Sequence, residues 1–162
     1  MNESRTPRAR RSPTAGELSA WRGFVETSER IRSVIGSRLQ TDSGLSTGDY
    51  AVLLSLSESE DHRVRSSDLA ARVGWERSRL SHHLGRMEQR GLIRREECLT
   101  DNRGAEACLT PAGADAFRRA SAPHLHAVQE LFVSALTPDQ LESVAGITAA
   151  LSSHLESIGT TP

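Results

Sequence analysis

Hydrogen-bond donors lie along one side of the segment from about Arg77 to Arg90. Its apolar residues, Leu80, Leu84 and Met87, are spaced by four and three, which predicts a helix that buries them. The opposite side then presents guanidinium, hydroxyl and imidazole groups, which suit guanine edges and phosphate oxygens. The candidate contact residues are Arg77, Ser78, Arg79, Ser81, His82 and Arg86. Such a face also occurs on proteins that bind no nucleic acid, so both interpretations stay open at this point.

The elements before this helix suggest how it would be presented. A brief helix capped by Ser66 or Ser67 precedes it, and residues 74–76 (Gly-Trp-Glu) form the turn between the two. Gly91 ends the second helix in the left-handed position that glycine favours. This order is that of a helix-turn-helix, whose second helix enters the major groove of DNA.

A β-hairpin is predicted directly after the second helix. Its strands are Leu92–Leu99 and Glu106–Leu109, and Val64 is expected to form a very short strand further upstream. At the polar tip, Arg103 is a candidate for insertion into the minor groove, and Asp101 could hold its guanidinium by an ion pair. Alternatively, the pair only stiffens a surface hairpin. With the hairpin, the segment Ser66–Gly113 has the element order of a winged helix-turn-helix.

Amphipathic helices are predicted on both sides of this central part. The first runs from Glu17 to about Gln40, and Ser46 caps the next one. The buried side of that second helix is expected to hold Tyr50, Leu53, Leu54 and Leu56. Thr110 caps a later helix, which Pro123 should kink or divide. Residues 137–140 (Thr-Pro-Asp-Gln) form a capping box that opens the last helix.

Charge is distributed unevenly over the 162 residues. The formal net charge is −1, yet residues 1–16 carry +3 and residues 63–103 carry +4, against −8 elsewhere. A basic middle part in an acidic chain fits a phosphate-facing surface, although an unevenly charged, solvated surface would look the same. Residues 1–16 have almost nothing apolar to bury, and they are predicted to form a disordered basic arm.

Several function classes lack their sequence signals. No apolar run approaches the roughly 18 residues of a membrane span, and no signal-peptide pattern follows the first arginines, so we expect a cytoplasmic protein. Glycine-rich phosphate loops, nucleophile elbows and His-Glu-x-x-His are missing, and no Cys/His spacing suits zinc. The sequence therefore predicts neither an enzyme nor a cofactor. Cys98 and Cys108 are too few for a disulfide scaffold.

Residues 64–113 resemble the DNA-binding part of the MarR family of bacterial regulators. Asp101-Asn102-Arg103-Gly104, followed by Leu109-Thr110-Pro111-Ala112-Gly113, matches the wing pattern of that family, D-x-R then L-T-x-x-G. The stretch from Leu84 to Ile93 resembles the end of its recognition helix, and the flanking helices extend the resemblance to residues 17–158. His82 and His83 depart from the pattern, because arginine and an apolar residue are usual there. We expect His83 to lie half-buried beneath the helix.

The resemblance implies a sequence-specific transcriptional regulator, more often a repressor, that binds a pseudo-palindromic operator in double-stranded DNA as an obligate homodimer. The predicted fold is mainly α with a small β-hairpin wing. In it, a winged helix-turn-helix at residues 46–110 is flanked by dimerisation helices at residues 17–45 and 111–158. The apolar stripes of the outer helices are long for so small a centre, which independently favours a second subunit.

The resemblance also implies a cleft for a small aromatic or phenolic effector. Its candidate lining is Trp21, Phe24, Tyr50 and Leu54, with Arg79 or His83 near the mouth, although aromatic residues on such faces more often belong to a core.

A redox-responsive regulator is an alternative, because Cys98 and Cys108 flank the wing tip and could sit opposite each other in a regular hairpin. Another alternative is a winged-helix module for protein interaction, against which the outward arginines argue.

Overall fold

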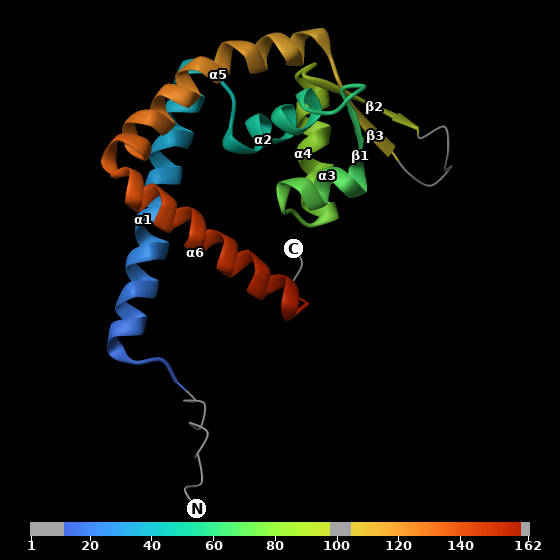
Figure 1. Cartoon of the computed structure of the whole chain (residues 1–162). Helices are drawn as coiled ribbons and strands as arrows, with labels where there is room; N and C mark the ends of the chain where they lie inside the picture. Colours follow the sequence, from blue (N-terminus) through green and yellow to red (C-terminus); the bar gives the residue numbers. More distant parts are fainter. Residues whose placement is uncertain (1–11, 98–104, 160–162) are drawn as a thin grey trace, which may run out of the picture. The chain divides into compact units, whose positions relative to one another are not determined.

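The computed structural model describes residues 12–97 and 105–159. The chain divides into two compact units, Met1–Val34 and Ile35–Pro162, and helix α1 (Ala15–Ser43) runs from the first into the second (Figure 1). At the start of α1, the Thr14 backbone N–H donates to Oε2 of Glu17 at 2.6 Å, and the Glu17 N–H donates to Oγ1 of Thr14 at 3.3 Å. The predicted first helix is therefore confirmed, and it continues to Ser43, where Gly44 follows with a φ of 68°.

Helix α2 (Thr47–Ser57) begins at the predicted cap, Ser46. The Asp49 backbone N–H donates to Oγ of Ser46 at 3.1 Å, and the Ser46 N–H donates to Oδ2 of Asp49 at 2.9 Å. Three of the four residues expected on the buried side of this helix are buried, but Leu54 is 36% exposed. Its predicted burial is wrong because Leu54 lies about 200° around the helix from the fully buried Val52.

The helix-turn-helix is confirmed as α3 (Ser66–Val73) and α4 (Arg77–Gln89). Gly74 and Gly91 end the two helices with φ values of 67° and 70°. The expected cap of α3 is wrong, because Arg65 is the N-cap residue and provides no side-chain cap. Ser66 instead donates its hydroxyl to the carbonyl oxygen of Ala105 at 2.8 Å.

The predicted hairpin is part of a three-stranded antiparallel sheet in the order β1-β3-β2. Strands β2 (Ile93–Glu97) and β3 (Ala105–Leu109) form the hairpin, and β1 (Arg63–Arg65) confirms the very short strand at Val64. Cys108 pairs with Arg94 on β2, so its cross-strand partner is not the one that the redox alternative requires. Cys98 lies outside the described residues, but the register gives Cys108 a different cross-strand partner.

The remaining helices follow the sheet. Helix α5 (Pro111–Leu131) is capped by Thr110, as predicted, and passes through Pro123 without being divided. A 3₁₀ turn, η1 (Val133–Ala135), separates α5 from α6 (Pro138–Ser157), which begins with the predicted capping box. The described part of α6 contains no buried residue.

One apolar core lies between α2, α3, α4, the sheet and the first half of α5. The largest fully buried side chains include Leu53, Leu56, Leu69, Leu80, Leu84, Met87 and Ile93. Gly113 lies so close to the strand start that a methyl group there would be 1.9 Å from the carbonyl oxygen of Leu92. This contact explains why glycine ends the L-T-x-x-G stretch, and it locks α5 against the hairpin.

Candidate nucleic-acid interface

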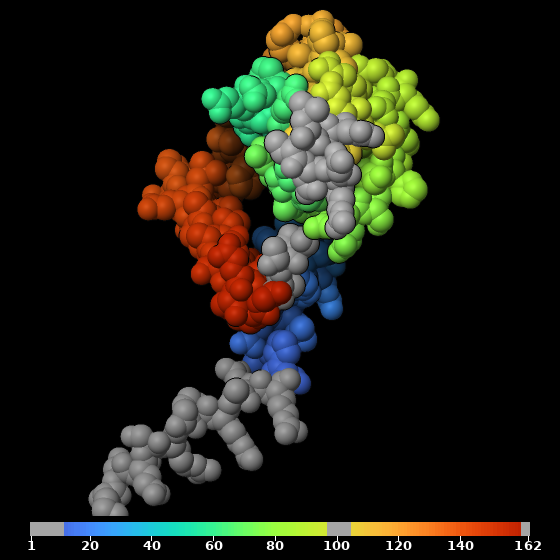
Figure 2. Space-filling model, turned by 90° about the vertical axis from the view of Figure 1, so that its right-hand side faces the viewer, coloured from blue at the N-terminus to red at the C-terminus, as the bar shows by residue number. Residues whose placement is uncertain are grey.

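The outer side of α4 is an open surface of the winged lobe. Leu80, Leu84 and Met87 are fully buried on the inner side, because they share one face at helical spacing. All six donors that the sequence assigned to the outer side are exposed: Arg77, Ser78, Arg79, Ser81, His82 and Arg86. In the space-filling view the atoms of α3 and α4, green to yellow-green, lie at the surface of the lobe (Figure 2). The helix thus presents donors outward from a rigid support.

Arg79 is held against an aromatic ring at the start of the helix. Its guanidinium carbon lies 4.5 Å from the centre of the Trp75 ring. A cation over the face of an indole is attracted by the ring quadrupole, which limits the rotamers that Arg79 samples. The ring of Trp75 also packs edge-on against His83, with centroids 5.0 Å apart.

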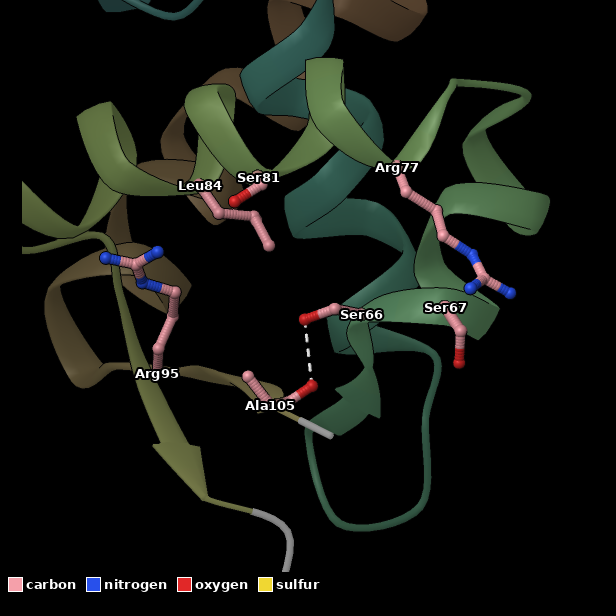
Figure 3. Close-up of a pocket in the computed structure, with 7 residues that line it drawn as sticks. All are labelled: Ser66, Ser67, Arg77, Ser81, Leu84, Arg95 and Ala105. Atoms are coloured by element: carbon pink, nitrogen blue, oxygen red, sulfur yellow. Dashed lines mark hydrogen bonds between the residues drawn. The ribbon is translucent and has the colours of Figure 1, made fainter. Parts of the chain in front are cut away.

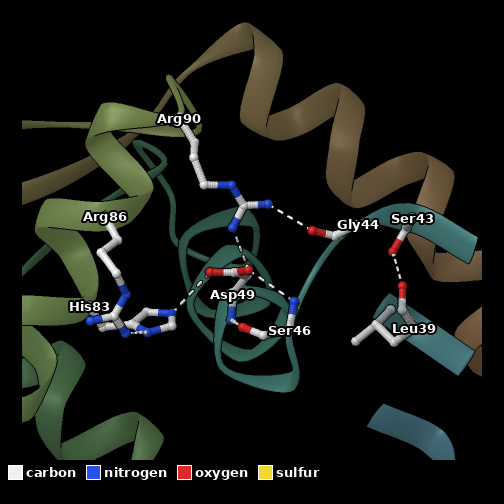
Figure 4. A network of polar contacts seen from close by, with 8 residues as sticks. All are labelled: Leu39, Ser43, Gly44, Ser46, Asp49, His83, Arg86 and Arg90. Atoms are coloured by element: carbon white, nitrogen blue, oxygen red, sulfur yellow. Dashed lines mark hydrogen bonds and ion pairs between the residues drawn. The ribbon is translucent and has the colours of Figure 1, made fainter. Parts of the chain in front are cut away.

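Arg86 takes part in a polar network beneath the helix (Figure 4). Its NH2 group lies 2.9 Å from Nδ1 of His83, and Nε2 of His83 lies 3.0 Å from Oδ1 of Asp49. NH1 of Arg90 donates to the other carboxylate oxygen of Asp49 at 2.7 Å. His83 is 9% exposed, so it is more deeply buried than the half-buried position expected.

The pKa of Asp49 lies well below its usual value. Burial alone raises it, since Asp49 is 3% exposed, but the hydrogen bonds from His83, the Ser46 backbone and Arg90 together outweigh that penalty. The carboxylate is therefore ionised at neutral pH, and it places a buried negative charge between His83 on α4 and Arg90, which directly follows that helix.

A recess of about 240 Å³ lies between α3, α4 and the strands (Figure 3). Its lining residues are Ser66, Ser67, Arg77, Ser81, Leu84, Arg95 and Ala105. Arg95 is oriented by Glu88, which accepts from its Nε at 2.8 Å and from its backbone N–H at 2.9 Å. Arg77 and Arg95 are the cationic residues of its lining.

Sequence reasoning missed Arg95 and Ser67 as members of this surface. A signal existed for Arg95, since it follows the buried Ile93 by two residues and therefore shares the face of β2 that looks toward α4. No comparable signal marks Ser67, whose hydroxyl donates to Asp68 at 3.1 Å.

The wing tip residues Arg103 and Asp101 lie outside the described residues. The outer surface of the described sheet carries charged pairs. Nε of Arg94 donates to Glu96 at 2.5 Å, and NH1 of Arg63 lies 3.7 Å from both Glu96 and Glu106.

The four candidate effector residues fall in different environments, and one of them, Leu54 on α2, is 36% exposed. Trp21 and Phe24 belong to the first unit, where their side chains are 65% and 49% exposed. Tyr50 belongs to the second unit and is buried, with its ring 5.2 Å from Phe117 and 4.2 Å from His124. Burial lowers the pKa of His124. Tyr50 is therefore part of an aromatic core.

The described residues show neither a membrane span nor a metal site. None of their helices combines the length and the apolar character that a membrane span requires. Nor does any group of three or more His, Cys, Asp and Glu side chains among them come together as a metal site.

Known proteins share this architecture. The model of the MarR family matches residues 45–104. AbsC, a MarR family transcriptional regulator from Streptomyces coelicolor, is 36% identical over 91% of this chain and 99% of AbsC, with a TM-score of 0.85. Sco3205, a MarR family regulator from the same organism solved in complex with DNA, is 36% identical over 90% of this chain and 91% of its own, with a TM-score of 0.86.

A curated protein sequence is also similar to this chain. The transcriptional repressor MprA of Escherichia coli strain K12 is 27% identical over 113 residues, which make up 70% of this chain. The chain spans 64% of the length of MprA.

Proposed function

Because the chain belongs to the MarR family of transcriptional regulators, we propose that it binds a pseudo-palindromic DNA operator as a homodimer. Helix α4 of each protomer would enter one major groove, and the two half-sites would lie roughly 34–36 Å apart on one face of the duplex. Arg79 and Ser81 are the proposed base readers. Arg103 is the proposed minor-groove probe, supported by Asp101.

The single observation that carries this proposal is the division of α4 into two faces. One face is buried in the core, and the other presents six exposed donors, Arg77, Ser78, Arg79, Ser81, His82 and Arg86. Ser67 and Arg95 extend the same surface toward the strands, around the recess. We assign Arg77 and Arg95 to phosphate contacts, because guanidinium groups bind phosphate oxygens well and such contacts do not read base identity.

Exposed apolar side chains support the homodimer. On α6, Ile147, Leu151 and Leu155 follow one another at intervals of four and are each about half exposed. Leu18 and Val34 on α1 are exposed to a similar degree. Apolar stripes of this kind are unfavourable in water, and a second copy of the chain would cover them.

Repression is the proposed mode of action, since MprA is a transcriptional repressor. A small aromatic or phenolic effector remains part of the proposal, with Trp21 and Phe24 as its exposed rings and Leu54 as a half-exposed apolar contact. Tyr50 contributes less, because its ring already packs in the core. We place the protein in the cytoplasm, where its operator would be.

The test is a selection of bound sequences from random duplexes with the purified protein, followed by titrations of the selected operator at several salt concentrations. Specific binding should weaken steeply with salt, because each phosphate contact releases counterions. Arg79→Ala should cost about 1–3 kcal/mol and relax the preference at one base pair, and Arg103→Ala should weaken binding without unfolding the protein. Arg118→Ala, on the exposed side of α5, is the matched control. Full affinity in both test variants would refute the site.

A further inference from the structure

Two arginines of the proposed reading surface rest on planar side chains that touch each other. Arg79 lies over the ring of Trp75 at 4.5 Å, and Arg86 lies 2.9 Å from Nδ1 of His83. Trp75 and His83 meet edge to face, with their ring planes at 80°. The four side chains thus form one continuous layer, which we call the aromatic shelf: Trp75, Arg79, His83 and Arg86.

The aromatic shelf packs on bare backbone. A methyl group added at Gly48 would lie 2.6 Å from Cη2 of Trp75 and 3.0 Å from Cε1 of His83. Both rings therefore lie directly against the first turn of α2, at a distance that only glycine allows. The positions of the rings are set by α2 as well as by the turn that carries Trp75.

The contact of His83 with Arg86 determines which ring nitrogen carries the proton. An arginine N–H can only donate, so Nδ1 accepts from Arg86 and has no hydrogen. Nε2 then carries the proton and faces the Asp49 carboxylate at 3.0 Å. Asp49 is itself held by the backbone of Ser46 and by Arg90, whose NH2 also donates to the Gly44 carbonyl oxygen at 2.8 Å. The shelf is anchored to the junction of α1 and α2.

We propose that Trp75 and His83 are positioning residues, which hold Arg79 and Arg86 in their DNA-reading orientations before DNA arrives. A free arginine loses several rotamers when it binds, and this loss reduces affinity. Side chains already stacked and hydrogen-bonded lose fewer. The inference rests on the proposed function, since it assigns a role in reading to residues that lie behind the reading surface.

A double-mutant cycle tests it on the full-length protein with the selected operator. Trp75→Leu alone should weaken operator binding about 2- to 10-fold. When it is made in the Arg79→Ala variant, it should weaken the binding of that variant by less than about twofold. The salt dependence should be unchanged by Trp75→Leu, because no charge is removed. Trp75→Leu should also relax the base preference at the same base pair as Arg79→Ala. Trp75→Phe, which keeps a ring face, should retain most of the affinity and most of the base preference.

Controls separate positioning from folding. The pair Trp75→Leu and Arg77→Ala should be additive, because Arg77 does not stack on Trp75. His83→Leu and Arg86→Ala should show the same coupling as the Trp75 and Arg79 pair. The unfolding midpoint of every variant shows whether a loss of affinity comes from a less stable fold. If Trp75→Leu does not fold, Trp75→Phe replaces it in the test.

The outcomes are distinguishable from those of the proposed function. If the wild-type protein selects no operator, both proposals are overturned. If it selects one and Trp75→Leu costs the same with and without Arg79→Ala, only the positioning role is overturned. A DNA-free measurement checks the stack itself: with Trp21→Phe, Trp75 is the single tryptophan, and its emission should change on Arg79→Ala. Unchanged emission also overturns the inference.

Discussion

Nε2 of His83 lies 3.0 Å from Oδ1 of Asp49, which joins the middle of α4 to the first turn of α2. The same carboxylate closes the capping box of α2 and accepts from Arg90. One buried group thus completes a helix cap and supports the helix proposed to read DNA. Asp49 therefore links the stability of the fold to the orientation of α4.

Asp49→Asn should lower the free energy of unfolding by about 1.5–3 kcal/mol at pH 7, since hydrogen bonds to a charged group are lost. The folded-state pKa of Asp49 is below its unfolded value, so its contribution is fully present above about pH 5. The contribution is lost as the pH falls below about 4, toward the folded pKa. Urea unfolding of both proteins from pH 3 to pH 7 checks this. A difference that grows on acidification would contradict it.

Gly113→Ala should destabilise the protein by about 2 kcal/mol or more, because the new methyl group meets the Leu92 carbonyl oxygen on rigid backbone. Gly85→Ala is the matched comparison, since nothing lies within 4 Å of the corresponding position on α4. That change should stabilise the helix by about 0.5–1 kcal/mol. Thermal unfolding measures both, and equal effects of the two substitutions would exclude the steric explanation.

Leu151→Arg should raise the dissociation constant of the proposed dimer at least about tenfold, because it would bury an unpaired charge between the two copies. Ser153→Arg adds the same charge about 200° around α6 from the apolar stripe and should leave the dimer intact. Sedimentation velocity over a dilution series distinguishes them. If Leu151→Arg remains dimeric to the same dilution as the wild type, α6 is not the interface.

Cys108 should react slowly with iodoacetamide in the native protein. Burial and the nearby charge of Glu96 raise the pKa of its thiol, so little thiolate is present near pH 7. The measurement uses Cys98→Ser, which leaves one cysteine, and compares native with urea-unfolded protein. Rapid labelling of the native protein, or peroxide-sensitive DNA binding that disappears in the double variant Cys98→Ser, Cys108→Ser, would restore the redox alternative.

Helix ends are the part of this fold that sequence predicts well, because caps depend on residues three positions apart. Ser46, Thr110 and Thr137 each accept from the backbone N–H three residues later. The cap of α3 was predicted wrongly because Ser66 finds its partner at Ala105, 39 positions along the chain. Pairings at that distance leave no trace in local sequence.

Pro123 lies inside α5 and does not end the helix. Its missing N–H removes one hydrogen bond of α5, which was expected to kink or divide the helix. The helix is not divided, since it runs on to Leu131, with Ala116, Ala120 and Ala127 buried on both sides of the proline. The kink at Pro123 stays a prediction.

The outer face of α4 was predictable from the 3.6-residue period. The contacts that hold its side chains from beneath were only partly predictable. His83 and Arg86 are three apart on one helix, a spacing at which side chains meet. The pairing of Arg90 with Asp49 spans 41 positions, and it emerges only once α2 and α4 pack together. The departure of His83 from the family pattern was the one local hint of that network.

In the proposed complex with DNA, the strand order β1-β3-β2 would make binding sensitive to the shape of the duplex. Strand β3 is hydrogen-bonded on both edges, and its neighbour β1 leads directly into α3. The hairpin and the helix-turn-helix therefore cannot pivot separately without breaking that ladder. A duplex whose groove spacing differs from the distance between the two would have to deform to fit, and this penalty would discriminate between operators of equal base content.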